Sequence, residues 1–159
     1  MTTLRASRPA ALVCLSVVLM VGFAGCQPAA QTVRVTRVLD GDTVVIETGE
    51  RVRYIGIDAP EMGPPAEPFA REALIANRAL VEGKRVRLEK DASDTDRYGR
   101  LLRYVYVDGT LVNAELVRLG LAHSRAYPPD TRHQEYLDAI ESAARAAGLG
   151  IWSGQQASP

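Results

Sequence analysis

Hydrophobic and polar residues alternate in several short stretches of this chain, which is the pattern of β-strands with one buried face. The alternation predicts five strands, at Thr32–Leu39, Thr43–Thr48, Arg51–Ile57, Lys84–Glu89 and Arg100–Val107. Two of the connections, Gly49-Glu50 and Asp108-Gly109, consist of residues typical of tight turns. Short strands joined by such turns suit a small barrel.

Three further segments carry apolar residues at helical spacing and end at a glycine. They predict helices at Glu67–Glu82, Val112–Leu119 and Thr131–Ala147. Together with the strands they predict an α+β fold, a five-stranded OB-type Greek-key β-barrel with about three helices packed on it. Barrels of this type commonly bind oligonucleotides, but a fold alone does not define a function.

The first residues of the chain have the pattern of an export signal. Arg5 and Arg8 precede an apolar run of 16 residues, Ala10–Gly25, which is shorter than the roughly 20 residues that span a membrane as a helix. The run ends in Phe23-Ala24-Gly25-Cys26, which resembles the lipobox of bacterial lipoproteins. We therefore expect a signal peptide at residues 1–25, lipidation of Cys26, and a linker that ends at residue 31.

The resulting expectation is an exported, membrane-anchored lipoprotein. An ordinary cleaved signal, which would make the protein secreted, or an uncleaved anchor are the alternatives. Residues 32–153 form the folded domain, long enough for one core, and residues 154–159 form a frayed tail. Both cysteines, Cys14 and Cys26, precede this domain, so no disulfide is expected within it.

The charge balance limits how the domain can contact nucleic acid. The whole chain has 19 basic and 19 acidic residues. Without Arg5 and Arg8, 17 basic residues remain against 19 acidic ones, a net charge near −2. Proteins that coat nucleic acid without specificity are usually strongly basic. Any nucleic-acid contact must therefore be made by a few well-placed arginines.

Acidic residues at strand ends predict a metal site on the barrel rim. Asp42 precedes one predicted strand and Asp58 follows another, and Pro60 restricts Ala59 to an extended conformation that directs its carbonyl. Two carboxylates and one carbonyl are hard oxygen donors of the kind that Ca²⁺ prefers, with about six to eight ligands in all. The remaining positions would be open to water and to a phosphate oxygen. The same donors would also suit Mn²⁺ or Mg²⁺.

Arginine and glutamate near these carboxylates predict phosphodiester chemistry. Arg53 and Arg100 can each donate two hydrogen bonds to one phosphate and stabilise the negative charge that develops on it. Glu61 can orient or deprotonate an attacking water. Arginine hardly loses a proton, so the proton donor for the leaving group stays open.

Several motifs in the same order resemble the staphylococcal nuclease (thermonuclease) family over most of residues 32–153. The matching segments are Leu39–Thr43, Arg53–Glu61, Asp96–Arg100, Val112–Ala122 and Gly150–Ser153. The resemblance implies a Ca²⁺-dependent phosphodiesterase that acts on single-stranded or fraying DNA and RNA, cleaving the 5′ P–O bond and leaving 3′-phosphates.

The resemblance also implies a role for each site residue. Asp42, Asp58 and Ala59 would be the metal ligands, Arg53 and Arg100 the phosphate clamp, and Glu61 the general base. Tyr98 and Tyr127 are similar to tyrosines that contact the nucleotide. Two departures concern substrate binding: the loop after Glu61 is short and lacks lysines, and the segment that ends at Tyr127 is one residue shorter than the family pattern.

Two other functions stay open at this stage. The barrel can be a catalytically silent nucleic-acid-binding lipoprotein, although domains of that kind typically lose the carboxylates or arginines. It can also be a lipoprotein interaction module without a nucleic-acid role. A monomer is expected, tethered to a membrane by its lipid anchor.

Overall fold

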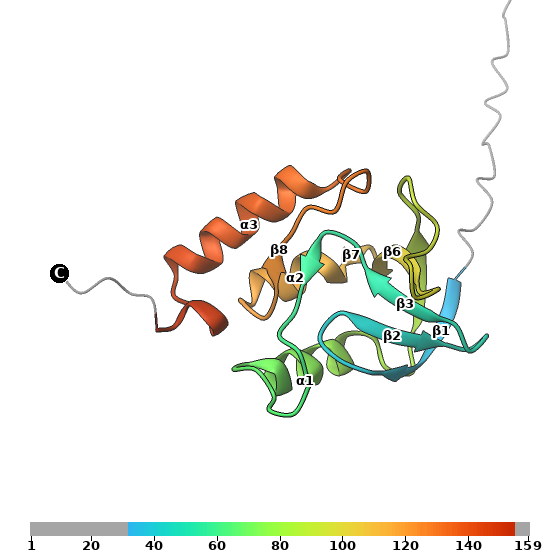
Figure 1. Cartoon of the computed structure of the whole chain (residues 1–159), viewed down its shortest axis with the longest axis horizontal. Helices are drawn as coiled ribbons and strands as arrows, with labels where there is room; N and C mark the ends of the chain where they lie inside the picture. The colour runs from blue at the N-terminus through green and yellow to red at the C-terminus, as the bar shows by residue number, and fades with distance from the viewer. Residues whose placement is uncertain (1–31, 155–159) are drawn as a thin grey trace, which may run out of the picture.

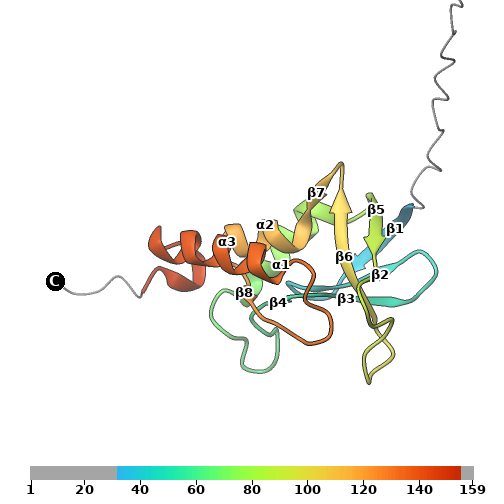
Figure 2. The same ribbon diagram turned by 90° about the horizontal axis from the view of Figure 1, so that it is seen from above.

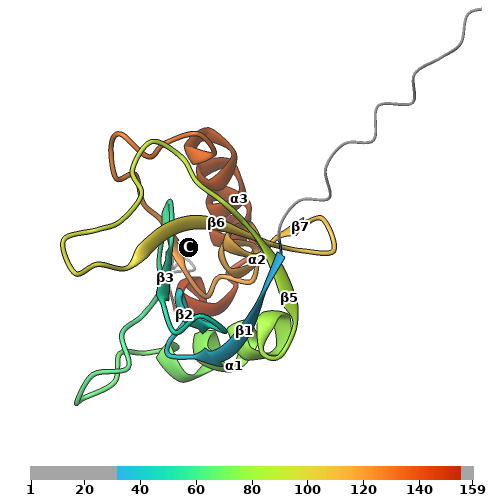
Figure 3. The same cartoon turned by 90° about the vertical axis from the view of Figure 1, so that its right-hand side faces the viewer.

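The computed structural model describes residues 32–154. Five strands form a closed barrel: β1 (Thr32–Val38), β2 (Thr43–Ile46), β3 (Arg51–Tyr54), β5 (Arg85–Glu89) and β6 (Leu101–Val107). Neighbours pair in the order β3-β2-β1-β5-β6, and a parallel pairing of β3 with β6 closes the ring. Figure 3 shows these strands surrounding a common interior. The expected α+β fold with an OB-type five-stranded barrel is confirmed.

Three helices complete the domain: α1 (Ala70–Val81), α2 (Val112–Arg118) and α3 (Gln134–Ala146), with a short 3₁₀ turn η1 (Gly150–Trp152) after α3. A short strand β7 (Thr110–Leu111) extends β6, and β4 (Ile57–Asp58) pairs with β8 (His123–Ser124). Helix α1 lies beneath β1 and β2 (Figure 1). Helices α2 and α3 lie on the side of the molecule opposite β1 and β5 (Figure 2).

The core consists of aliphatic side chains from the inner faces of the strands, together with residues from the three helices. Its fully buried members include Val35, Val44, Val52, Ile57, Val81, Val86, Val105, Leu116 and Leu137. Within residues 32–154 no helix is long and apolar enough to cross a membrane. The predicted signal peptide, Cys26 and the linker lie outside the described residues, as do residues 155–159 of the predicted tail.

Two buried amides tie the helices to the barrel. Asn77 of α1 accepts a hydrogen bond from the Tyr54 hydroxyl (3.0 Å) and donates one to the carbonyl of Asp40 (3.1 Å). Asn113 of α2 accepts from the Val105 N–H (3.0 Å) and donates to the carbonyl of Ile55 (2.8 Å). Both amides are fully buried, so they satisfy backbone groups that would otherwise lack partners.

The structure corrects several element boundaries. The predicted strand Arg51–Ile57 is interrupted, because Gly56 adopts a positive φ of 76° and Ile57 then starts the separate strand β4. Helix α1 begins at Ala70 and not at Glu67, because Phe69 has a left-handed φ of 66° that cannot continue a helix. Helix α3 begins at Gln134, three residues later than predicted.

Candidate active site

The turn between β1 and β2 places Asp42 beside the segment that follows β4. The N–H of Asp42 donates to Asp40 Oδ1 (2.9 Å), which fixes the turn. At Gly41, a Cβ atom would lie 2.5 Å from the Cβ of Ala59 and 2.8 Å from that of Ala73. The turn can therefore reach both Ala59 and α1 only because residue 41 is a glycine.

Asp42 is buried and has several partners within its own site. Its Oδ2 accepts a hydrogen bond from the Ala59 N–H (2.8 Å) and forms an ion pair with Arg53. Its Oδ1 accepts from the Thr43 hydroxyl (3.2 Å). Burial raises the pKa of Asp42 to about 7, although the charge of Arg53 opposes this, and the nearby Asp40 raises it further.

Arg53 occupies the centre of the site. Its side chain is only 12% exposed, and its guanidinium bridges Asp42 and Asp58, with an Nη2 to Asp58 Oδ1 distance of 2.8 Å. Burial lowers the pKa of Arg53, but the two carboxylates outweigh it and hold the pKa above its usual value. The guanidinium is therefore charged and fixed in one orientation by the carboxylates on each side of it.

Asp58, at the end of β4, is shared between two arginines. Its Oδ1 binds Arg53 and its Oδ2 binds Nη1 of Arg125 (2.9 Å). The pairing of β4 with β8, in which Asp58 lies opposite His123, brings Arg125 to this carboxylate. Sequence reasoning missed Arg125, because two-residue strands leave no alternating pattern from which their pairing can be predicted.

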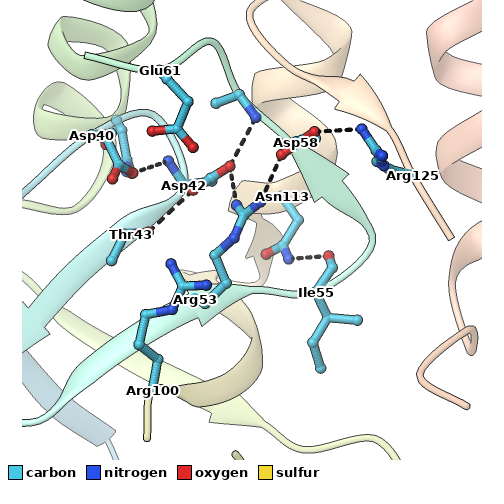
Figure 4. Close-up of polar contacts among 12 residues, drawn as sticks. Asp40, Asp42, Thr43, Arg53, Ile55, Asp58, Glu61, Arg100, Asn113 and Arg125 are labelled. Atoms are coloured by element: carbon cyan, nitrogen blue, oxygen red, sulfur yellow. Dashed lines mark hydrogen bonds and ion pairs between the residues drawn. The ribbon is translucent and has the colours of Figure 1, made fainter. Parts of the chain in front are cut away.

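Glu61 lies on the same rim. Its N–H donates to Glu67 Oε2 (2.9 Å), and its carbonyl accepts from the Glu67 N–H (3.0 Å), so its backbone is held by the loop itself. Figure 4 shows the Glu61 carboxylate turned toward Asp40 and Asp42. Among residues 32–154 this carboxylate has no hydrogen-bond donor of its own.

Arg100 reaches the site from the position just before β6, the strand that pairs with β3 to close the barrel. Its Nε binds Asp96 Oδ2 (2.6 Å), and its N–H donates to Asp96 Oδ1 (3.0 Å). Its two terminal nitrogens form no hydrogen bond with any residue in 32–154. Figure 4 shows the Arg100 and Arg53 guanidinium groups on the same side of the site.

A cavity of about 450 Å³ adjoins the two arginines. Both tyrosines expected to contact substrate line it: Tyr98 on the loop before β6 and Tyr127 on the loop before α3. The Arg100 guanidinium lies 5.5 Å from the Tyr98 ring centroid. The structure therefore brings Tyr98, Tyr127, Arg53 and Arg100 together around one cavity.

The remaining question is whether these residues suit a divalent cation. In the part of the chain that the structure describes, no three acidic, histidine or cysteine side chains form a metal-binding group by themselves. Asp42 and Asp58 are hard oxygen donors, Ala59 lies beside them, and burial is the main reason that the pKa of Asp42 is raised. This donor set fits an open site for a hard cation that water and substrate complete.

A barrel rim that presents arginines, carboxylates and a tyrosine-lined cavity suits the binding of nucleic-acid phosphates. The comparisons with known proteins agree. The family model described as "Staphylococcal nuclease homologue" matches residues 51–154. The chain belongs to this family, and its fold and relatives support a nucleic-acid hydrolase.

Two relatives illustrate the similarity. The chain is 35% identical to a thermonuclease of Staphylococcus hyicus over 129 residues, covering 77% of this chain and 76% of the relative. It is 40% identical to the endonuclease YncB of Bacillus subtilis over 129 residues, covering 76% of this chain and 61% of that protein.

Proposed function

We propose that the protein is a Ca²⁺-dependent phosphodiesterase that hydrolyses single-stranded or fraying DNA and RNA. The observation that carries this proposal is the position of Arg53 and Arg100 on one cavity with Tyr98 and Tyr127, directly beside the Asp42–Asp58 pair that Arg53 bridges. Arginines that can bind a phosphate, carboxylates that can bind a metal ion and tyrosine rings that can contact bases therefore lie next to one another.

Asp42, Asp58 and the carbonyl of Ala59 are the proposed Ca²⁺ ligands. Once bound, the ion supplies positive charge that polarises the phosphate and lowers the pKa of water. The chain contributes the arrangement of its oxygen donors, which the Asp40 turn and the Ala59 N–H hold in place. Such preorganisation reduces the cost of assembling the site.

Arg53 and Arg100 are the proposed phosphate clamp. Arg53 is oriented by two carboxylates, and Arg100 is oriented through its Nε by Asp96. Each can direct N–H groups at a phosphate, and charge-assisted pairs of this geometry are among the stronger hydrogen bonds in proteins. Their charge is most stabilising when the phosphate gains negative charge in the transition state.

Glu61 is the proposed general base. Its carboxylate has no partner within residues 32–154 and faces the carboxylate cluster (Figure 4). In the proposed reaction the oxygen of a water forms a bond to phosphorus while Glu61 accepts the proton of that water. The bond from phosphorus to O5′ breaks, O5′ gains a proton, and the products carry a 3′-phosphate and a 5′-hydroxyl.

Tyr98 and Tyr127 are the proposed nucleotide contacts. Both rings are exposed at the cavity, so a base or sugar can pack on either of them. Stacking of a base on an aromatic side chain contributes about 1–3 kcal/mol and tolerates any base. A site of this kind favours single strands, whose bases are free to stack, over intact duplexes.

The test is hydrolysis of a labelled single-stranded oligonucleotide by the purified protein, with Ca²⁺ and with excess chelator. Asp42→Ala, purified in the same way, is the control for a contaminating nuclease. We expect cleavage that requires Ca²⁺ and is lost in the variant, with 3′-phosphate ends. Circular dichroism of both proteins checks that the variant is folded.

The opposite result has a clear meaning. A folded protein that binds the oligonucleotide without cleaving it would establish the catalytically silent binding module instead. A folded protein that neither binds nor cleaves would reject any nucleic-acid role.

The membrane tether is a separate proposal that depends on the sequence alone. We propose that the protein is exported and anchored through lipid on Cys26, since Phe23-Ala24-Gly25-Cys26 directly follows the apolar run. Metabolic labelling with a radioactive fatty acid tests it: the wild type should take up label and sediment with membranes, and Cys26→Ala should do neither. Equal labelling of the two proteins would contradict the tether.

A further inference from the structure

Arg125 is a third guanidinium in this site, with no role in the function proposed so far. It directly follows β8, and its N–H donates to the carbonyl of Gly56 (2.9 Å). Arg125 is the first residue after β8, the strand that pairs with β4 and places His123 opposite Asp58. The β4–β8 pairing therefore fixes the backbone of Arg125 close to Asp58. Figure 4 shows its side chain extending toward Asp58 from the side opposite Arg53.

The Arg125 side chain is held far less firmly than that of Arg53. It is 61% exposed, against 12% for Arg53, and its one carboxylate partner among residues 32–154 is Asp58 Oδ2, at 2.9 Å. Exposed ion pairs contribute little to stability, because water screens them and the side chain loses freedom when it pairs. The guanidinium can therefore leave Asp58 for another anion at little cost.

The surroundings of Arg125 indicate which anion that is. Its guanidinium lies 5.7 Å from the ring centroid of Tyr127, which lines the cavity beside Arg53. Arg53 and Arg125 bind opposite oxygens of one carboxylate, so only Asp58 and two hydrogen bonds of 2.8 and 2.9 Å separate the two guanidinium groups. A strand with one phosphate at Arg53 would bring the next within reach of Arg125.

We propose that Arg125 binds the phosphodiester next to the one that is cleaved, and so gives the enzyme a preference for oligonucleotides over dinucleotides. This inference rests on the proposed nuclease function, because it takes Arg53 to mark the position of the scissile phosphate. In the free protein Asp58 holds Arg125 near the cavity. Substrate then replaces that carboxylate as its partner.

The first experiment measures binding without cleavage. Fluorescence anisotropy of a labelled 12-residue oligothymidylate in excess chelator gives the dissociation constant at a series of salt concentrations. For single strands the slope of log affinity against log salt changes by about 0.7 for each phosphate contacted. We expect Arg125→Ala to reduce the slope by about that amount and Arg125→Lys, which keeps the charge, to retain it.

Arg118→Ala is the matched control. Arg118 is 60% exposed and is paired with one carboxylate, Glu115, on α2, so its removal changes the net charge equally. Its salt slope should equal that of the wild type. Equal salt slopes for Arg125→Ala and the wild type would overturn the proposal. A slope that decreases as much in Arg118→Ala as in Arg125→Ala would also overturn it.

The second experiment measures cleavage in Ca²⁺. For the oligothymidylate, kcat/KM of Arg125→Ala should fall about tenfold, which is the lower end of the range expected when a hydrogen bond to a charged group is lost. For thymidylyl-thymidine, which has a single phosphate, it should be unchanged. Equal losses on both substrates would overturn the proposal. A wild type that binds but cleaves neither would reject the nuclease function, while the salt slopes would still test Arg125.

Discussion

Replacing Asn77 with alanine should destabilise the domain and loosen the Asp40–Asp42 turn. Asn77 links the Tyr54 hydroxyl to the Asp40 carbonyl through hydrogen bonds of 3.0 and 3.1 Å. Alanine removes both bonds at once, inside a region where Tyr54 and residue 77 are fully buried. The same turn carries Asp42, so a change that loosens the turn at Asp40 also affects the proposed active site.

The magnitude follows from the two groups that lose their partners. A buried donor or acceptor without a partner costs about 1–3 kcal/mol. The Tyr54 hydroxyl is fully buried and the Asp40 carbonyl is partly buried, so we expect a loss of about 3 kcal/mol in the free energy of unfolding. Since small domains are stable by only about 5–15 kcal/mol, this is a large fraction of the total.

Urea denaturation followed by circular dichroism measures this loss, and a double-mutant cycle identifies its cause. In Tyr54→Phe the hydroxyl is already absent, so adding Asn77→Ala strands only the Asp40 carbonyl. The two changes should therefore couple by about 1–2 kcal/mol, within the range usual for residues in contact. Ile75→Ala, on the same helix at a side chain that is 56% exposed, should change stability by less than about 0.5 kcal/mol.

Two results would refute this reasoning. One is a loss below about 1 kcal/mol in Asn77→Ala, which would mean that the two groups find other partners. The other is an additive cycle, which would mean that the loss comes from helix packing and not from the Tyr54–Asn77 bond.

Three further changes test other parts of the domain. Gly120→Ala should lower the thermal midpoint strongly, because φ is 68° and a Cβ would lie 2.3 Å from the Leu149 carbonyl oxygen; an unchanged midpoint would contradict this. Asn113→Ala should speed amide exchange at the barrel closure and cost about 3 kcal/mol by urea denaturation, since it strands two buried backbone groups; a loss below about 1 kcal/mol would argue against it. Hydrogen bonding from Arg87 holds the pKa of Glu89 below its usual value despite its partial burial, so Glu89 stabilises the fold above its unfolded pKa and loses this effect as the pH falls through its folded pKa. The difference in free energy of unfolding between the wild type and Glu89→Gln should therefore shrink as the pH falls from about 6 to about 3. A difference that stays constant would mean that ionised Glu89 does not stabilise the fold.

The parts of the fold that could be predicted from the sequence are those with a local pattern. The strands of the barrel alternate, and the residues Asp42, Asp58 and Arg53 stand at strand ends or on strands where turn residues mark the boundaries. The family motifs then relate these positions to one another. For this reason the barrel and the grouping of these side chains are both found in the structure.

The parts that could not be predicted depend on contacts between distant segments. On α1 the apolar residues Ala73, Ala76 and Leu80 recur at helical spacing, but the buried face includes the polar Asn77, and Ala76 is only partly buried. The residues near Asn77 in the sequence do not indicate that the distant Tyr54 hydroxyl will donate a hydrogen bond to its side chain. On α3 the spacing alone would put Tyr136 with the apolar residues, but its side chain is exposed, because the helix packs mainly through Leu137 and Ala144.

Barrel closure also sets the spacing of the two arginines proposed to bind phosphate. In the parallel β3–β6 pairing Arg53 lies opposite Leu102, so Arg100 directly precedes the paired segment of β6. Val52 and Tyr54, on each side of Arg53, are buried in the core. A one-residue shift of register would turn Arg53 inward and these two residues outward, at the cost of burying a charge and exposing apolar surface. The packing of the core therefore fixes how Arg53 faces Arg100, and changes that weaken the closure should reduce phosphate binding before they unfold the domain.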